Sequence, residues 1–335
     1  MRQIIQRPII LVLLPVLFLL ACDPLAPRQV TPVAVIVSPE PSATFPATAT
    51  IPSTATRTPF PSQAPELTST PTPFPCDDDS GQVVEFNEFR SPTANENLRY
   101  QVYIPPCYLE TQKRYPTLIL LHGLSFRENH WVNLGVADAL DQGIRLGALS
   151  PMLVIMPFMG TIGQRNSFPP DPSYETVLLD ELIPAIERDF CTWNDREHRA
   201  IGGISRGGFW AFSVTLRHPD LFGIVGGHSA VFPESIREVP PAFNPLELAL
   251  NSSFLSEADL RIFLDNGAND SAGPNQQLFS SRLSSRGISH SYVINPVGEH
   301  DNEYWSAHVS EYLTFYARDW PRTFDELPSC MEPSP

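Results

Sequence analysis

Positively charged residues are scarce in this chain. It has 22 lysines and arginines against 37 aspartates and glutamates, which gives a formal net charge of −15 at pH 7. Proteins that bind nucleic acid, or that dock on anionic lipid through basic patches, need the opposite balance because clustered cations attract phosphate groups. The composition therefore argues against nucleic acid as a partner and against membrane docking through basic patches.

The chain also has no apolar run that is comfortably long enough to span a bilayer. The apolar residues 8–20 follow two arginines, Arg2 and Arg7, and end at Leu19-Leu20-Ala21-Cys22, an arrangement typical of an export signal. A small residue before a cysteine resembles the bacterial lipobox, which is cut before the cysteine that then carries lipid. Leu20 departs from the small residue usual at that place, so an ordinary secretory signal or an uncleaved anchor is the alternative. We expect an exported lipoprotein, anchored through Cys22 on the extracytoplasmic side of a bacterial membrane.

Cysteines are few, and their spacing does not fit a zinc site. Beyond Cys22 the sequence has Cys76, Cys107, Cys191 and Cys330. An even number in an exported chain favours two disulfides, for which three pairings exist. We favour Cys76–Cys107, which would flank an N-terminal strand pair, and Cys191–Cys330, which would tie down the tail.

Residues 23–75 differ sharply in composition from the rest of the chain. Of these 53 residues, 13 are proline and 15 are serine or threonine. Such a segment cannot bury enough apolar surface to offset the entropy of ordering it, so we expect a disordered spacer. Residues 76–335 then form one large domain.

Within residues 76–335, strand-like and helix-like patterns alternate. We expect strands at 82–89, 98–104, 117–121, 152–156, 222–229, 260–264 and 290–294, and helices at 174–190, 207–217, 275–286 and 302–319. The first two strands alternate in polarity like an antiparallel edge, whereas 117–121 and 152–156 are unbroken apolar runs typical of buried parallel strands. We expect Pro184 to kink its helix and residues 231–258 to form a loop or small cap. This order predicts an α/β protein with a mostly parallel sheet.

The pattern G-x-S-x-G occurs at Gly203-Ile204-Ser205-Arg206-Gly207. In a nucleophile elbow with this pattern, a serine occupies a sharp turn from a strand to a helix, and glycines flank it because side chains would collide across the turn. The turn places the serine at the positive N-terminus of the helix, where free N–H groups can bind an oxyanion. We therefore expect Ser205 to be the nucleophile.

An elbow serine needs a histidine base and a carboxylate that holds the base in the correct tautomer. His300 lies between the last predicted strand and the last helix, at the carboxyl edge of the sheet where such folds place their sites. For the acid we prefer Asp270, which lies far enough into its loop to reach across to His300. Asp265 ends its strand and is the second candidate, and Asp301 is the third.

Two backbone N–H groups are needed to bind the oxyanion. We expect one from Arg206, directly after the nucleophile, and one from Leu124, in the loop after the strand at 117–121. His122 is either a residue that shapes this loop or the pocket, or a hydrogen-bonded structural histidine. Phe126, Trp131 and Phe158 either line an acyl or aromatic pocket or belong to the core.

Together these residues resemble the esterase group of α/β-hydrolases. That group includes esterase D-like enzymes, feruloyl and acetyl-xylan esterase domains, enterochelin esterase-like proteins and mycolyltransferases. The resemblance covers most of residues 83–320 and is carried by the segments 102–108, 115–123 with Trp131, 203–208, 217–222, 267–270 and 300–305. It implies an α/β-hydrolase fold with helices on both faces of the sheet, and a Ser205–Asp270–His300 triad. Two residues depart from the group: Cys107 replaces a usual glycine, and Arg206 replaces a common methionine and would put a cation at the mouth of the site.

These expectations lead to a serine hydrolase that cleaves a carboxylic ester, small or glycan-linked, without a metal or cofactor. Two alternatives use the same residues differently. An acyltransferase would pass the acyl group to an alcohol instead of water, and an inactive domain would serve as a surface-anchored binding module. The sequence does not identify the ester.

Overall fold

The computed structural model describes residues 80–235 and 237–331, all within a compact unit formed by Thr70–Pro335. The expected signal, the spacer, the lipidation site Cys22 and the cysteine Cys76 lie outside the described residues. Among the described residues, no helix is long and apolar enough to cross a membrane.

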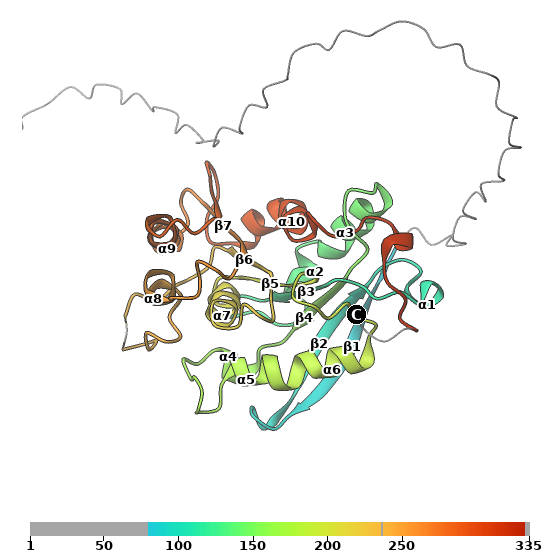
Figure 1. The fold of residues 1–335 in the computed structure, drawn as a ribbon, viewed down its shortest axis with the longest axis horizontal. Coiled ribbons are helices and arrows are strands. Elements are labelled where there is room, and N and C mark those ends of the chain that lie inside the picture. The colour runs from blue at the N-terminus through green and yellow to red at the C-terminus, as the bar shows by residue number, and fades with distance from the viewer. Residues whose placement is uncertain (1–79, 236, 332–335) are drawn as a thin grey trace, which may run out of the picture. The chain divides into compact units, whose positions relative to one another are not determined.

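One mixed sheet forms the centre of the described domain (Figure 1). Its strands are β1 (Gln82–Ser91), β2 (Glu96–Ile104), β3 (Thr117–Leu121), β4 (Leu153–Pro157), β5 (Arg199–Ile204), β6 (Ile224–His228), β7 (Arg261–Gly267) and β8 (Ser291–Asn295). The spatial order is β1-β2-β4-β3-β5-β6-β7-β8. The pairings from β4 to β8 are parallel, and β1 and β2 add an antiparallel edge. The expected fold class is therefore confirmed, including its antiparallel N-terminal edge.

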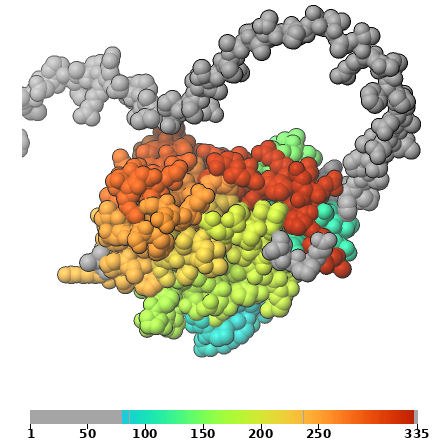
Figure 2. Space-filling model, viewed as in Figure 1, coloured from blue at the N-terminus to red at the C-terminus, as the bar shows by residue number. Residues whose placement is uncertain are grey.

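Helices cover both faces of this sheet. They are α1 (Tyr108–Thr111), α2 (His130–Asn133), α3 (Val136–Arg145), α4 (Gly160–Gly163), α5 (Tyr174–Thr176), α6 (Ile183–Asp189), α7 (Arg206–Thr215), α8 (Pro245–Asn251), α9 (Gly273–Ser285) and α10 (Asn302–Ala317). Figure 1 shows α3 and α10 together on one side of the sheet and α5 and α6 on the other. In Figure 2 the orange C-terminal segments lie directly against the yellow middle of the chain, so the described residues form one continuous body.

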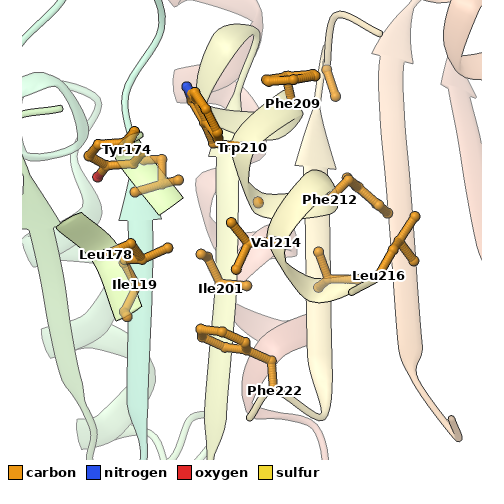
Figure 3. Packing of buried hydrophobic residues seen from close by; sticks show 14 of the residues in the cluster. Ile119, Tyr174, Leu178, Ile201, Phe209, Trp210, Phe212, Val214, Leu216 and Phe222 are labelled. Carbon is orange, nitrogen blue, oxygen red and sulfur yellow. The ribbon is translucent and has the colours of Figure 1, made fainter. Parts of the chain in front are cut away.

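The parallel strands are buried on both faces, as their unbroken apolar sequences predict. Along β3, Ile119 and Leu121 belong to one apolar cluster and Leu118 and Leu120 to the other, because successive side chains point to opposite faces. Figure 3 shows the first cluster, in which Ile119 and Ile201 of the sheet face α7 and the helical segment that contains Tyr174. The second cluster joins the sheet to α3 and α10. The two cores fix the loops at the strand ends.

The expected helix at 174–190 contains a widened turn instead of a simple kink. Between α5 and α6, residues Val177–Leu182 form a π-helix, in which the Ile183 N–H donates to Leu178 O five residues back. Pro184 has no N–H and its ring would clash with the carbonyl four residues earlier, so a wider turn relieves the conflict. Residues 231–258, expected to form a loop or small cap, contain the short helix α8.

One expected disulfide is present. Cys191 and Cys330 are bonded, with their Cα atoms 5.8 Å apart and their positions 139 apart in the sequence. Cys330 N–H also donates to Gln112 O at 2.7 Å, and the Arg114 N–H donates to Pro328 O at 2.8 Å, so hydrogen bonds hold the tail in addition to the disulfide. Cys107 is disulfide-bonded as well, and Cys76, its expected partner, lies outside the described residues.

Candidate active site

Ser205 occupies a strained turn between β5 and α7. Its backbone angles, φ 55° and ψ −113°, are unusual for a residue with a side chain. The turn is fixed by the Ser205 N–H, which donates to His228 O at 3.0 Å. A Cβ atom at Gly203 would lie 2.3 Å from the Gly207 carbonyl carbon, and one at Gly207 would lie 2.4 Å from Leu121 O. Both glycines are therefore sterically required, as the motif predicts.

Three side chains from separate loops meet at this turn. His300 Nε2 lies 2.9 Å from Ser205 Oγ, and His300 Nδ1 lies 2.9 Å from Asp270 Oδ1. The three residues follow β5, β7 and β8, so they converge because the carboxyl ends of parallel strands meet at one edge of the sheet. The structure thus brings together the serine, histidine and aspartate that the sequence singled out.

The Asp270 carboxylate is buried but strongly hydrogen-bonded. Burial by itself raises its pKa, but the contact with His300, the nearby Ser229 hydroxyl and the hydrogen bond from the Ala272 N–H outweigh that effect, so the pKa lies below its usual value. The Ala272 N–H donates to Asp270 Oδ1 at 2.7 Å. Asp270 is therefore ionised at neutral pH and can hold the proton of His300 Nδ1 in place.

Asp265, the second candidate acid, lies elsewhere. It is buried, and its carboxylate contacts His228 Nδ1 at 2.8 Å and accepts hydrogen bonds from the hydroxyls of Tyr304 and Tyr312 at 2.6 and 2.9 Å. It therefore connects β6 and β7 to α10. Asp301, the third candidate, caps α10 by accepting a hydrogen bond from the Tyr304 N–H at 2.9 Å.

The two expected oxyanion donors lie on different segments. Arg206 directly follows Ser205, and Leu124 lies in the loop after β3, the strand that pairs with β5. Within the described residues, neither the Leu124 N–H nor the Arg206 N–H has a hydrogen-bond acceptor. The Phe126 N–H donates to Gly123 O at 3.1 Å, which closes the turn that contains Leu124. A Cβ atom at Gly123 would lie 3.1 Å from the Phe126 ring, so glycine also gives this turn its room.

The His122 side chain holds the same loop in place through two hydrogen bonds. Its Nε2 accepts a hydrogen bond from the Met159 N–H at 3.0 Å, so the proton resides on Nδ1, which contacts Gly123 O at 2.7 Å. Burial lowers the pKa of His122 to about 4. His122 is therefore a neutral, hydrogen-bonded residue that shapes the loop, and it does not line the cavity.

The Arg206 side chain does not put a cation at the mouth of the site, which corrects that expectation. Its guanidinium donates to Gly163 O at 2.9 Å, to Asn166 Oδ1 at 2.7 Å and to Arg165 O. It also lies over the rings of Phe209 and Trp210. Burial lowers its pKa to about 10. Arg206 anchors the loop after α4 while its backbone stays at the elbow.

A cavity of about 640 Å³ opens onto Ser205. It is lined by residues 123–126, by residues 300–303 and by Trp305. Phe126 is part of the lining, as expected, and its ring is stacked on His130 with ring centres 3.7 Å apart. The expectation that Trp131 lines the pocket is wrong. Trp131 is only 1% exposed and donates from Nε1 to Leu121 O, so it is a core residue.

Two residues at the site were not selected individually from the sequence. Trp305 lines the cavity, and its ring lies edge-on to His300, with ring centres 5.1 Å apart. Ser229 is fully buried, and its hydroxyl accepts a hydrogen bond from Trp305 Nε1 at 2.8 Å. A tryptophan five residues after the predicted base, near the start of a helix, was a usable signal for Trp305. Nothing in the sequence marks Ser229. In residues 80–235 and 237–331, no group of three or more histidine, cysteine or acidic side chains is arranged to hold a metal ion.

Known proteins share both the sequence and the fold of this domain. One relative, an endo-1,4-beta-xylanase/feruloyl esterase of Xylanibacter ruminicola, is 34% identical over 164 residues, which is 45% of this chain and 22% of that protein. Another, an esterase of Mycobacterium tuberculosis, is 29% identical over 160 residues, 45% of this chain and 33% of that protein. The chain thus spans a third or less of the length of these relatives.

Among solved structures, a ferulic acid esterase aligns with a TM-score of 0.65 and 27% identity, covering 71% of this chain and 98% of that one. The S-formylglutathione hydrolase of Staphylococcus aureus aligns with a TM-score of 0.61 and 20% identity, covering 70% and 99%. These likenesses confirm the α/β-hydrolase fold. Residues 91–320 match the family described as "Putative esterase". The chain therefore belongs to this esterase family.

Proposed function

We propose that this protein is a serine esterase that cleaves a carboxylic ester through an acyl-enzyme intermediate. The observation that carries the proposal is the chain of two hydrogen-bond contacts, each 2.9 Å long, from Ser205 Oγ through His300 to Asp270. The same spacing between nucleophile, base and acid is what proton transfer from a serine requires. The names of the relatives, which are esterases and feruloyl esterases, support the same reaction.

In the first half of the proposed reaction, Ser205 Oγ attacks the ester carbonyl carbon while its proton moves to His300 Nε2. Asp270 stabilises the imidazolium that forms. The C–O bond to the alcohol then breaks, and His300 returns the proton to the departing alkoxide. In the second half, His300 removes a proton from water as the water oxygen attacks the acyl carbon. The bond from that carbon to Ser205 Oγ then breaks, and His300 returns the proton to Oγ, which releases the acid and regenerates Ser205.

We propose that the Leu124 and Arg206 N–H groups bind the oxyanion of the tetrahedral intermediates. Both lack a competing acceptor within the described residues, and Leu124 lies in the cavity lining. The Arg206 N–H also belongs to the first turn of α7, where the positive end of the helix dipole favours negative charge. Fixed donors of this kind stabilise charge without reorganising during the reaction.

The cavity lining favours an aromatic or other apolar acyl group. Leu124, Phe126 and Trp305 supply apolar surface to the lining, with the ring centres of Phe126 and Trp305 6.4 Å apart. We propose a small or glycan-linked ester as substrate, with hydroxycinnamoyl esters first among the candidates because two similar proteins are named for feruloyl or ferulic acid esters. A screen of matched aryl esters that differ only in the acyl group will rank the candidates. Uniform rates across apolar and polar acyl groups would contradict this assignment.

The decisive experiment for the mechanism is covalent labelling of the full chain with a fluorophosphonate, followed by peptide mass spectrometry. We expect a single adduct at Ser205 in the wild-type chain. In Ser205→Ala, ester turnover should fall by several powers of ten, and the melting temperature should stay within a few degrees of the wild-type value. An inert wild-type chain would favour the binding module instead. Transfer of the acyl group to an added sugar alcohol, in preference to water, would favour the acyltransferase.

We further propose that the chain is exported and anchored in a membrane through a lipid on Cys22. The proposal is supported by the export-type signal at residues 1–22 and by the Cys191–Cys330 disulfide, since stable disulfides are typical of oxidising compartments. Expression with a radiolabelled fatty acid should label the wild-type chain but not Cys22→Ser. Equal labelling of both chains, or labelling of neither, would refute the anchor.

A further inference from the structure

Ser229 occupies a special position directly after β6. It is fully buried, and its φ of 51° lies in the left-handed region that non-glycine residues seldom adopt. Its N–H donates to Asp265 O at 2.8 Å, which fixes the backbone between β6 and β7. An alanine or a glycine could make that backbone contact equally well. The contacts of the hydroxyl are therefore what distinguish serine at this position.

The hydroxyl of Ser229 is oriented by Trp305. Trp305 Nε1 is a donor only, and it donates to Ser229 Oγ at 2.8 Å. The proton of the Ser229 hydroxyl is thus left for a different acceptor. The same indole ring lies edge-on to His300, with ring centres 5.1 Å apart, so Trp305 contacts the base on one side and Ser229 on the other.

The Asp270 carboxylate has one oxygen in need of a donor. Its Oδ1 lies within hydrogen-bonding distance of both His300 Nδ1 and the Ala272 N–H. Its Oδ2 is buried, and no aligned donor meets it within the described residues. Ser229 is close enough that its hydroxyl helps to lower the pKa of Asp270, although the hydroxyl is not aligned on Oδ2 as a full hydrogen bond. A buried carboxylate oxygen without a donor is costly, and the Ser229 hydroxyl is a neighbouring donor whose proton is not used in its contact with Trp305.

We propose that Ser229 is a positioning residue for the reaction: held by Trp305, its hydroxyl donates to Asp270 Oδ2 and keeps the carboxylate aligned on His300. The inference rests on the proposed function. Ser229 does not touch the substrate or the reacting atoms, and no proton is transferred to or from it. Its effect reaches Ser205 only through Asp270 and His300.

The test compares Ser229→Ala and Ser229→Gly with the wild-type full chain. Both variants lose the hydroxyl, but glycine also relieves the left-handed backbone, so it separates the side-chain effect from a folding defect. We expect kcat to fall about tenfold to a hundredfold in both, as for a lost hydrogen bond to a charged group. We expect KM to stay within about threefold, because Ser229 does not line the cavity. Ser213→Ala is the matched control, since Ser213 is equally buried and donates to Phe243 O, away from Asp270.

A double-mutant cycle separates positioning from a general structural role. In an Asp270→Ala background, Ser229→Ala should cause no further loss in the rate of fluorophosphonate labelling, because the carboxylate that Ser229 positions is gone. Additive losses in the cycle, or full activity of Ser229→Gly, would overturn the inference. If instead the wild-type chain is not labelled at Ser205, the proposed function itself fails, which is a distinct outcome.

Discussion

Replacing Asp270 with asparagine should remove charge from the site while leaving its geometry in place. Asp270 Oδ1 lies within hydrogen-bonding distance of two N–H groups, those of His300 and Ala272. An asparagine can keep its carbonyl oxygen at the same position, so the tautomer of His300 is retained. What is lost is the attraction between the carboxylate and the imidazolium that forms as Ser205 gives up its proton.

The size of this loss follows from the contact distance. Nδ1 and Oδ1 are 2.9 Å apart, which places the centres of charge roughly 4 Å apart. Two unit charges at that separation attract by about 4 kcal/mol at an effective dielectric constant of 20. Because each 1.36 kcal/mol is a factor of ten in rate, kcat should fall about a thousandfold. KM should change little, since Asp270 is buried and does not line the cavity.

Steady-state hydrolysis of an aryl ester by the full chain measures both constants, with circular dichroism to verify folding. Asp265→Asn is the matched control, because Asp265 is also a buried carboxylate next to a histidine but does not contact His300. We expect Asp265→Asn to lower the melting temperature but to leave kcat close to the wild-type value. A loss below tenfold in Asp270→Asn, together with a thousandfold loss in Asp265→Asn, would refute the assignment of the acid.

Three further predictions concern the scaffold of the site. Arg206→Ala should keep kcat within about threefold, because the backbone N–H remains, but should lower the free energy of unfolding by about 1–3 kcal/mol and speed protease cleavage near residues 163–166; a loss of kcat with no change in cleavage would contradict this. His122 has a folded-state pKa of about 4, below that of the unfolded chain, so stability should fall by up to about 3 kcal/mol as the pH drops from 6.5 to 4. His122→Asn should flatten that part of the pH curve in urea titrations, and an unchanged slope would count against it. Cys330→Ser removes the bond between positions 139 apart and should cost about 4–5 kcal/mol in urea unfolding, while Cys107 stays disulfide-bonded; an unchanged unfolding midpoint would contradict this.

Much of this fold could be predicted because its strands carry their own signal. A strand covered on both faces needs apolar side chains at every position, so 117–121 and 152–156 stood out without any tertiary information. The elbow could be recognised equally well. A Cβ atom at Gly207 would collide with Leu121 O, and one at Gly203 would collide with the Gly207 carbonyl carbon, so only glycine fits at both positions. His300 followed from its place after the last strand.

Side-chain directions could not be predicted in the same way. The sequence predicts Arg206 at the mouth of the site, but its guanidinium donates to three acceptors between Gly163 and Asn166, 40 to 43 positions away in the sequence. The sequence is consistent with Trp131 in the pocket or in the core, and in the structure its ring packs against His228 of β6 and Tyr312 of α10, contacts that no local pattern encodes. Asp270 contacts His300 and Asp265 contacts His228. The sequence shows only the distance of each aspartate from the end of its strand, whereas tertiary contacts fix the path of the loop that carries Asp270.

The turn at Ser205 has a practical consequence for engineering. A non-glycine residue at φ 55° and ψ −113° is strained, and such strain costs on the order of 1–3 kcal/mol. Glycine at the same position would relax the backbone and at the same time delete the nucleophile. A library selected for heat resistance alone would thus enrich chains that no longer turn over substrate. Any programme of thermal improvement for this domain should screen turnover in every round, or hold codon 205 constant.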